Sequence, residues 1–528
     1  MCLSNRKNIL YISLFLLIIV FAAAIRIPDL SRRPMHTDEA VNAVKFGSLL
    51  EENNYLYDKN EYHGPVLYYF TLIPALFSSA DNLKEVTEET LRLTPVVFGM
   101  LLIILLLFLA GGIGRPAVLG AALLTAMSPA MVFYSRYYIH EMLFVFFAFA
   151  ALICCYHYIK ERRICWAVGT GISLGLLLAT KETGIIVVVS MLAALFIIRL
   201  IEGKSSDFFK KNNYLHIALI FGVMIAVSAL FYSSFFKNPS GIVESYSAYK
   251  NYLNKAVNNE WHVYPWYYYI KLLVFPGDLS MPIWSEYYIV ILAAAGIIAG
   301  ISKKGIKNID LKLLRFISVY TLILIFVYSI IPYKTPWNML VFLHGLILLA
   351  GVGAVFVFEI MTNRYAKALI IILFIAAGSH LIIQSFSSNY KYYADPVNPY
   401  VYAHTTDDIF QIVREVESVA SVHPDGNQMY IEVICSGDDY WPLPWYLRAF
   451  PNAGWWSEVD MDVPAAPLII VSPDVIPDLT RKLYELPPPG KKNLYVSLVE
   501  PGTEIRPMVE LYVYVEKDLW DKYQQNKK

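Results

Sequence analysis

Long apolar stretches separated by short polar connections dominate the first 387 residues of the chain. The runs at 101–110, 185–198 and 368–377 are, with their flanks, long enough or nearly long enough to cross a bilayer, which takes a helix of about 20 residues. We predict about eleven spanning helices, at residues 9–25, 93–111, 117–134, 142–159, 164–180, 184–201, 214–236, 287–302, 312–332, 337–360 and 366–387. The apolar stretch at 66–77 is shorter and contains Pro74, so we predict that it lies at the membrane interface.

The charges between these spans predict the orientation of the chain. With the N-terminus in the cytoplasm, every predicted inner connection is short and basic, as the positive-inside rule requires. The basic residues of these connections are Arg6, Lys7, Arg115, Lys160, Arg162, Arg163, Lys204, Lys210, Lys211, Lys303, Lys304, Lys307, Arg364 and Lys367. We therefore predict a multi-pass cell-membrane protein with a cytoplasmic N-terminus. Its outer segments are residues 26–92, 136–141, 237–286 and everything from about 388 on.

Residues 388–528 predict a second domain, on the extracytoplasmic side, after a transmembrane domain of residues 1–387. An amphipathic helix is expected at 406–422, because Ile409, Val413, Val416 and Val419 recur near helical spacing. Apolar, β-branched runs predict strands between proline-rich turns. These runs lie at 430–434, 468–471, 494–499 and 511–515. The fold class is thus a polytopic α-helical membrane protein with a C-terminal α/β or α+β domain.

Composition supports this picture and excludes some functions. Hydrophobic residues make up 57% of the chain and charged residues 16%, against about 25% charged residues in an average soluble domain. The net charge is zero and no long basic run occurs, which argues against a nucleic-acid partner. Cys435 is the only cysteine of the predicted C-terminal domain, so no disulfide can form within it.

The first outer segment carries two adjacent acids, Asp38 and Glu39, shortly after His36, and further on it carries His63. Two carboxylates just past a membrane span can supply a general base and a second acid that orients a substrate or a metal. A simpler alternative is that the two acids begin a helix, since acidic side chains favour the first helical turn.

Three basic residues, Arg136, Lys181 and Lys334, stand on short outer turns, where the positive-inside rule does not explain them. Arg136 shares its turn with Glu141, and Lys181 is followed by Glu182. Cations gathered at the membrane surface suit the phosphate of a lipid carrier, because Arg and Lys stabilise the oxygens of a leaving phosphate. An interfacial salt bridge, or lysines reaching to the lipid headgroups, would explain each residue taken singly.

In this order the motifs resemble the GT-C superfamily of membrane glycosyltransferases, in particular its protein O-mannosyltransferase and aminoarabinose-transferase branch. The matching segments are Asp38-Glu39, His63-Gly64-Pro65, residues 91–95, residues 136–141, Lys181 and the turn around Lys334. Residues 35–43, 62–69, 332–337 and 438–448 resemble a sporadic archaeal and bacterial family named as flippase-activity-associated. Two departures concern the acceptor: the mannosyltransferases have His-Pro-Pro in place of His63-Gly64-Pro65, and the Trp-Trp-Asp-Tyr-Gly signature of oligosaccharyltransferases is absent from the sequence.

The resemblance implies an inverting transfer of a sugar from a polyprenyl- or dolichyl-phosphate donor. The acceptor would be a glycan, a lipid or a protein at the extracytoplasmic face. Asp38 is implied as the catalytic base, and Glu39 as the residue that positions the acceptor or a metal. The donor phosphate would bind Arg136, Lys181 and Lys334, and the substrates would also contact His36, His63, Glu141 and Glu182. No metal ligands are assigned, and a divalent cation stays open as a cofactor.

The alternative function is a flippase component for lipid-linked oligosaccharides, or another transporter, without transferase activity. Transporters place ionisable residues near the bilayer midplane, often on broken helices. Here the charged residues cluster at the outer ends of the predicted spans, and His344 is among the few polar groups inside one. This pattern favours an enzyme and leaves open a GT-C scaffold that only binds a lipid carrier.

Overall fold

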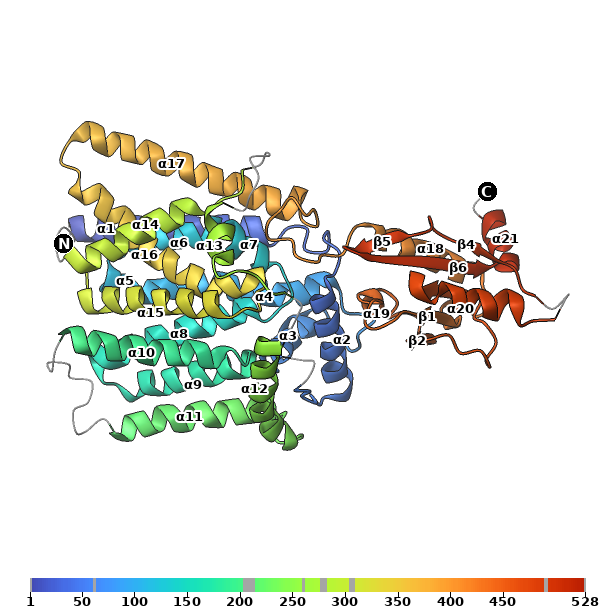
Figure 1. Ribbon diagram of the computed structural model, residues 1–528. Coiled ribbons are helices and arrows are strands. Elements are labelled where there is room, and N and C mark those ends of the chain that lie inside the picture. Colours follow the sequence, from blue (N-terminus) through green and yellow to red (C-terminus); the bar gives the residue numbers. More distant parts are fainter. Residues whose placement is uncertain are drawn as a thin grey trace.

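The computed structural model describes residues 2–59, 63–202, 214–258, 262–275, 283–302, 309–488 and 492–526. A bundle of helices carries the N-terminus at one end, and a small domain that contains a sheet extends from the other end (Figure 1). Tyr62 and the predicted inner residues Lys204, Lys210, Lys211, Lys303, Lys304 and Lys307 lie outside the described residues.

Eight helices of the described chain are long and apolar enough to span a membrane. They include α1 (Cys2–Arg26), α4 (Glu88–Leu105, continued through η1, Leu106–Leu109, and α5, Ala110–Ile113), α8 (Glu141–Glu161), α10 (Gly184–Glu202), α11 (Tyr214–Tyr232), α15 (Leu311–Ile330), α16 (Leu340–Ile360, preceded by η4, Pro336–Met339) and α17 (Arg364–Phe386). A ninth span results if α6 (Arg115–Met127) and α7 (Pro129–Ser135), which meet at a bend of 60°, are counted as one.

The predicted number of about eleven spans is therefore not confirmed, although helices occupy all eleven predicted places. The two others are α9 (Ile164–Thr180) and α14 (Tyr287–Ser302), with 17 and 16 residues. At a rise of about 1.5 Å per residue they are roughly 24–26 Å long, short of the ~30 Å hydrocarbon core. The stretch expected at the interface forms the 12-residue helix α3 (Val66–Phe77).

Close packing at small residues holds α16 against its neighbours. A Cβ added to Gly353 would lie 1.8 Å from the carbonyl oxygen of Leu292 on α14. At Gly351 it would lie 2.4 Å from the carbonyl oxygen of Ala117 on α6. Since lipid tails are as apolar as the helices, such close backbone contact is a main source of helix association in membranes.

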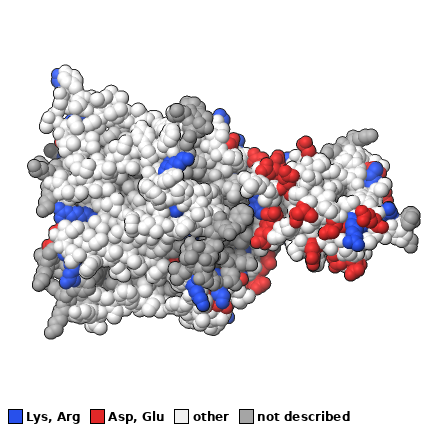
Figure 2. All heavy atoms as spheres, in the orientation of Figure 1, with Lys and Arg blue, Asp and Glu red and all other residues white. Residues whose placement is uncertain are grey.

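The basic connections gather at the end of the bundle that carries the N-terminus. The start of α1, the end of α8 and the start of α17 all lie there, opposite the sheet domain (Figure 1), and basic side chains mark this end of the surface (Figure 2). Arg115 donates to Asn8 across 2.5 Å, and Lys160 pairs with Asp310 at 3.4 Å. The predicted inner and outer segments thus fall at opposite ends of the bundle.

Short helices lie at the end of the bundle that faces the sheet domain (Figure 1). They are α2 (Thr37–Glu52), α3, α12 (Ser240–Asn258) and α13 (Tyr268–Val274). Helix α2 begins with a capping box, in which His36 is the N-cap and Glu39 reaches back to the backbone of His36. This local structure orients the two acids of the first outer segment.

The C-terminal domain contains a mixed six-stranded sheet of order β2-β1-β3-β6-β4, with β5 paired to β6. Strand β1 (Ile431–Ile434) is parallel to β2 (Ala453–Trp456) and β3 (Leu468–Val471), whereas β4 (Tyr495–Ser497), β5 (Thr503–Arg506) and β3 are antiparallel to β6 (Val509–Glu516). The domain also has helices α18 (Asp408–Val422), α19 (Leu443–Tyr446), α20 (Ile476–Thr480) and α21 (Lys517–Asn526).

The predicted elements of this domain are confirmed, and two strands were missed. Helix α18 buries all four apolar residues that predicted it, and β1, β3, β4 and β6 stand at the predicted runs. Strands β2 and β5 have only four residues each. A glycine in β2 and charged residues in β5 interrupt the apolar pattern that would predict a strand. The predicted boundary at residue 388 falls inside η5 (Ser387–Lys391), which continues α17, and it stays a prediction.

The sheet domain docks on the start of α2. The backbone N–H of Met35 donates to the Tyr446 hydroxyl across 2.8 Å, and the Thr405 hydroxyl donates to the Met35 carbonyl across 2.7 Å. The Trp445 indole N–H donates to Glu88 across 2.8 Å. The joint between the two parts is therefore built next to the acids Asp38 and Glu39.

Candidate functional site

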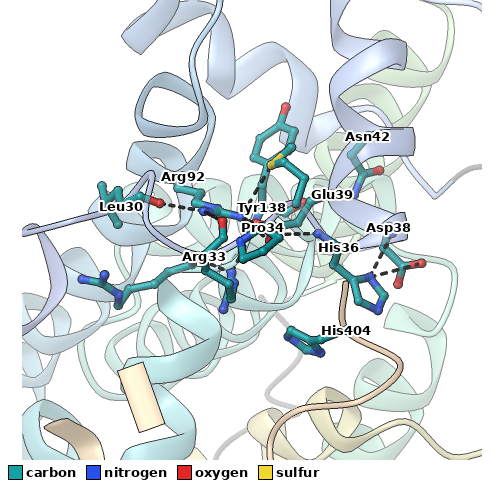
Figure 3. A network of polar contacts seen from close by, with 12 residues as sticks. Leu30, Arg33, Pro34, His36, Asp38, Glu39, Asn42, Arg92, Tyr138 and His404 are labelled. Atoms are coloured by element: carbon teal, nitrogen blue, oxygen red, sulfur yellow. Dashed lines mark hydrogen bonds and ion pairs between the residues drawn. The ribbon is translucent and has the colours of Figure 1, made fainter. Parts of the chain in front are cut away.

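Glu39 is fully buried and receives five hydrogen bonds. Arg92 binds both of its oxygens, with Nε on Oε1 at 2.8 Å and Nη2 on Oε2 at 2.7 Å. Arg33 donates to Oε1 across 3.3 Å, and the backbone N–H groups of Tyr138 and His36 add contacts of 2.8 and 3.1 Å. Figure 3 shows this network around Arg92. Glu39 therefore ties the first outer segment to α4 and to the turn after α7.

The charges of Arg92 and Arg33 lower the pKa of Glu39. Burial alone would raise the pKa of Glu39, but Arg92 and Arg33 and the hydrogen bonds outweigh it, and the pKa falls to about 2. With both oxygens occupied by donors, the carboxylate has little capacity left for a ligand. Its expected role in positioning an acceptor or a metal stays a prediction, and its contacts give it a structural one.

Asp38, one residue earlier, is free of this network. Its side chain is 48% exposed, whereas that of Glu39 is fully buried. The carboxylate lies on the side of His36 and His404, away from the Glu39–Arg92 pair (Figure 3). The Nδ1 of His36 lies 4.0 Å from it. Of the two adjacent acids, only Asp38 is available to take a proton from a substrate.

His36 is held in one tautomer. Its Nδ1 accepts from the backbone N–H of Asp38 at 3.0 Å, so Nε2 carries the proton that it donates to the carbonyl of Tyr402, also at 3.0 Å. Burial lowers the pKa of His36, so the ring is neutral at physiological pH. His36 therefore links Asp38 to Tyr402 on the segment that enters the C-terminal domain.

Lys334 is a buried cation on the turn before α16. Its ammonium donates to the carbonyl of Tyr264 at 3.0 Å and to that of Ile331. Within the described residues no carboxylate pairs with it. An ammonium has three N–H donors, so one is left for an anion. Burial lowers the pKa of Lys334.

A chain of contacts joins the Lys334 turn to Asp38. The backbone N–H of Lys334 donates to the His262 carbonyl across 3.0 Å, and the His262 ring bonds to the Tyr402 hydroxyl. Tyr402 in turn accepts from His36, the neighbour of Asp38. Burial lowers the pKa of His262, and the Asp38 carboxylate opposes that shift through space. These contacts connect the Lys334 turn to Asp38 through His262, Tyr402 and His36.

Lys181 lies beside this site and is already paired. Its ammonium contacts Glu141 at 2.6 Å and the side-chain oxygen of Asn338 at 3.1 Å. Asn338 belongs to η4, which directly follows the Lys334 turn. A small cavity of about 10 Å³ is lined by Lys181, Glu141, Asn338 and Trp337, among others. Three of the predicted residues, Lys181, Glu141 and Lys334, are therefore brought together around the start of α16.

His63 and Glu182 form a second pair of predicted residues. His63 Nδ1 lies 2.9 Å from Glu182, which also accepts from the Tyr57 hydroxyl at 2.8 Å. The neighbouring Gly64 fits closely against α9, since an added Cβ would lie 2.1 Å from the carbonyl oxygen of Ala179. This contact gives a physical reason for glycine in the His63-Gly64-Pro65 motif. Glu182 directly follows Lys181 in the sequence, so the His63–Glu182 pair lies next to Lys181.

Arg136 has a different environment. Its guanidinium donates to the carbonyls of Arg26, Pro28 and Asp29 at 2.7–3.0 Å, and it stacks on Tyr390 with 4.8 Å to the ring centre. These contacts fasten the end of α1 to the turn after α7. Within the described residues, none of its contacts joins it to Lys181, Lys334 or Asp38. Its predicted contact with the donor phosphate stays a prediction.

Comparisons with known proteins find one family model and several solved structures that are similar to the chain. The family model of dolichyl-phosphate-mannose-protein mannosyltransferases matches residues 16–239, which include Asp38, Arg136 and Lys181 and end before Lys334. The structure is similar to apo ArnT from Cupriavidus metallidurans, with a TM-score of 0.60 and 13% identity over 97% of this chain and 98% of that one. ArnT bound to undecaprenyl phosphate gives a TM-score of 0.58 over the same shares.

The family model covers less than half of the chain, and the solved structures show that its fold is similar to that of ArnT. The Archaeoglobus fulgidus oligosaccharyltransferase with a tethered acceptor peptide is also similar, with a TM-score of 0.57 and 13% identity. That match covers 86% of this chain, which spans 64% of the length of the oligosaccharyltransferase. No curated protein sequence matches the chain.

Several residues around this site were missed in the sequence. His262, Tyr264 and Tyr402 lie in an aromatic-rich loop and in the segment after α17, and no spacing connects them to Asp38 or Lys334. Arg92 lies in the segment 91–95 that the sequence analysis singled out, but its pairing with Glu39 was not predicted. Within the described residues, no group of three or more His, Cys, Asp or Glu is arranged to hold a metal ion.

Proposed function

We propose that this protein transfers a sugar from a lipid-phosphate-linked donor to an acceptor hydroxyl at the outer end of the bundle. The name of the matching family includes a dolichyl-phosphate sugar, and one similar structure holds undecaprenyl phosphate. Neither the family match nor the structural similarities point to a flippase.

One observation carries the proposal: an exposed carboxylate and a buried cation without an acidic partner share one site. Asp38 is the acid that is left free when Arg92 and Arg33 occupy Glu39, and Lys334 donates only to backbone carbonyls. A buried charge without a counterion is costly, and an incoming phosphate would provide that counterion. The site is thus suited to an anion at Lys334 and to a proton acceptor at Asp38.

The chemistry follows from these two groups. The oxygen of the acceptor hydroxyl attacks the anomeric carbon of the donor sugar, while the bond from that carbon to the phosphate oxygen breaks. Asp38 takes the proton of the hydroxyl as a general base. The lipid phosphate leaves with the bonding electrons, and Lys334 stabilises the negative charge that develops on it. Attack opposite to the leaving phosphate inverts the configuration of the sugar.

The other predicted residues fit around this reaction. Lys181, held by Glu141 at the cavity next to η4, would contact the donor phosphate from the second side. His36 orients the start of α2, and His63 with Glu182 would contact the substrates. Arg136 would act indirectly, since it holds the end of α1 from which the Asp38 segment begins.

The direct test uses the purified full chain in lipid nanodiscs with a panel of polyprenyl- and dolichyl-phosphate sugars. We expect the protein to release the free lipid phosphate from at least one of these donors, faster with an added acceptor extract than with water alone. Mass spectrometry of the lipid and acceptor products measures both. If no donor of the panel is consumed under conditions where the protein is folded, the proposed transfer is wrong.

The orientation is proposed with the N-terminus in the cytoplasm and the sheet domain outside. Ser421, exposed on α18, can be changed to Cys, and Cys165, exposed next to the basic connection after α8, serves as the internal control. In intact cells a membrane-impermeant maleimide should label the Ser421→Cys site and leave Cys165 unlabelled until the cells are permeabilised. The reverse labelling would place the sheet domain in the cytoplasm and contradict an extracytoplasmic site.

A further inference from the structure

A row of aromatic rings lies on the sheet domain beside two acids. The rings of Trp455 and Tyr440 are 5.2 Å apart, and those of Tyr440 and Trp441 are 5.6 Å apart. All three side chains are partly exposed. The row ends at a tight turn in which the backbone N–H of Trp441 donates to the carbonyl of Asp438 across 3.2 Å. Asp438, at the start of this turn, is exposed.

This row connects to the proposed active site through Arg506. Its guanidinium pairs with Asp439 at 2.9 Å and donates to the Asp438 carbonyl at 3.3 Å. Burial lowers the pKa of Arg506, and the carboxylates of Asp439, Asp438 and Asp38 oppose that shift. Asp38 is therefore close enough to interact with Arg506 through space. The segment 438–448 also contacts the residues just before Asp38, because the Tyr446 hydroxyl accepts from the backbone N–H of Met35 across 2.8 Å.

The chemistry of the row fits a sugar. Aromatic faces pack against the C–H faces of a pyranose ring, and carboxylates accept hydrogen bonds from its hydroxyl groups. Acidic side chains gather where the sheet domain meets the bundle (Figure 2). Such a surface attracts neither phosphorylated nor uronic acid chains, because like charges repel. The site thus favours a neutral carbohydrate.

We propose that Trp455, Tyr440, Trp441 and Asp438 form an acceptor subsite that binds a neutral oligosaccharide and presents its hydroxyl to Asp38. The inference rests on the proposed sugar transfer and adds the class of the acceptor, a neutral glycan. It also gives a function to the segment 438–448, which the reaction itself leaves unused. Arg506 positions the two acids of this subsite and is not itself a catalytic residue.

The test measures binding without any donor. Ligand-observed NMR on the full chain in nanodiscs would use neutral trisaccharides of glucose, mannose, galactose and N-acetylglucosamine, a uronic acid trisaccharide and a basic peptide. We expect at least one neutral trisaccharide to bind. Trp455→Ala should weaken that binding about tenfold through the lost ring contact, and Asp438→Asn should weaken it by a smaller factor.

Trp456→Ala is the matched control, because adjacent strand residues point to opposite faces of the sheet. Trp456 is 49% exposed and contacts the Tyr430 hydroxyl, not Tyr440. Its loss should leave binding unchanged. Equal weakening by both tryptophan variants, no binding of any neutral trisaccharide, or equal binding of the uronic acid chain or the peptide would each overturn the subsite. Donor consumption is measured separately, so a failed subsite does not contradict the transfer, and failed donor consumption leaves the binding result standing.

Discussion

Asp38→Asn should lower the rate of sugar transfer about 10²–10⁴-fold, the usual contribution of a well-placed general base. Asparagine keeps the shape of the side chain but cannot take the proton. Asp38 is half-exposed and makes few fixed contacts, so the variant should fold and bind the donor like the natural chain. Product formation at saturating donor, with donor binding and thermal stability measured on the same sample, checks this expectation. Transfer within a few-fold of the natural rate would exclude Asp38 as the base.

Glu39→Gln is the contrasting control, because it changes the adjacent acid. Breaking a buried ion pair costs about 3–5 kcal/mol of stability, so this variant should unfold at a lower temperature. The pKa of Glu39 is about 2 in the folded chain and near 4.5 when unfolded. The pair therefore stabilises the fold fully above about pH 4.5, and this stabilisation is lost as the pH falls toward 2. The variant should lack this part of the pH dependence.

Lys334→Met should weaken binding of the donor and slow the departure of its phosphate. A hydrogen bond to a charged group contributes about 1.5–3 kcal/mol, which corresponds to roughly a 10–150-fold weaker affinity. Lys334→Arg should restore part of the lost donor affinity, because the positive charge remains. The restoration is only partial, since a planar guanidinium takes the place of the ammonium. Titration of the nanodisc-embedded protein with a polyprenyl-phosphate sugar measures the affinity, and Lys84→Met, at an exposed lysine between α3 and α4, is the control.

The direction in which donor affinity changes with pH follows from the pKa of Lys334. Burial lowers the pKa of Lys334, so its charge is lost at a lower pH than that of an ordinary lysine. Donor affinity should therefore fall on the alkaline side, and Lys334→Arg should move this fall to higher pH. If Lys334→Met binds the donor as well as the Lys84→Met control, the lysine only contacts the Tyr264 and Ile331 carbonyls and has no part in donor binding.

The sequence predicted the helices of the bundle well, because crossing a bilayer imposes long apolar runs on any chain. Four strands of the C-terminal domain were predictable because they, too, lie in apolar runs of the sequence. Strands β2 and β5 were too short and too mixed in composition to be predicted. For the site, Asp38, Lys181 and Lys334 stay predictions from the sequence, which could not separate Asp38 from Glu39. Only the partners Arg92 and Arg33, 53 and 6 residues from Glu39 along the chain, show which acid is occupied.

Residues that act through distant contacts were the hardest to predict. Tyr402 joins His36 to His262 across gaps of 366 and 140 residues, and its own neighbours in sequence carry no catalytic pattern. Arg136 matched the pattern expected for a phosphate ligand, yet its side chain turns to the backbone carbonyls at the end of α1. A basic residue at the outer membrane surface serves an anion or a helix end equally well, and the sequence does not distinguish the two.

The central claim is that Asp38 and Lys334 act on the two ends of one bond between a sugar and a lipid phosphate. An experimental structure of the Asp38→Asn variant with a bound polyprenyl-phosphate sugar tests it most directly. We expect a phosphate oxygen within about 3 Å of the Lys334 ammonium, with the anomeric carbon of the sugar facing residue 38. A phosphate bound elsewhere, with Lys334 still donating only to the carbonyls of Tyr264 and Ile331, would contradict the claim.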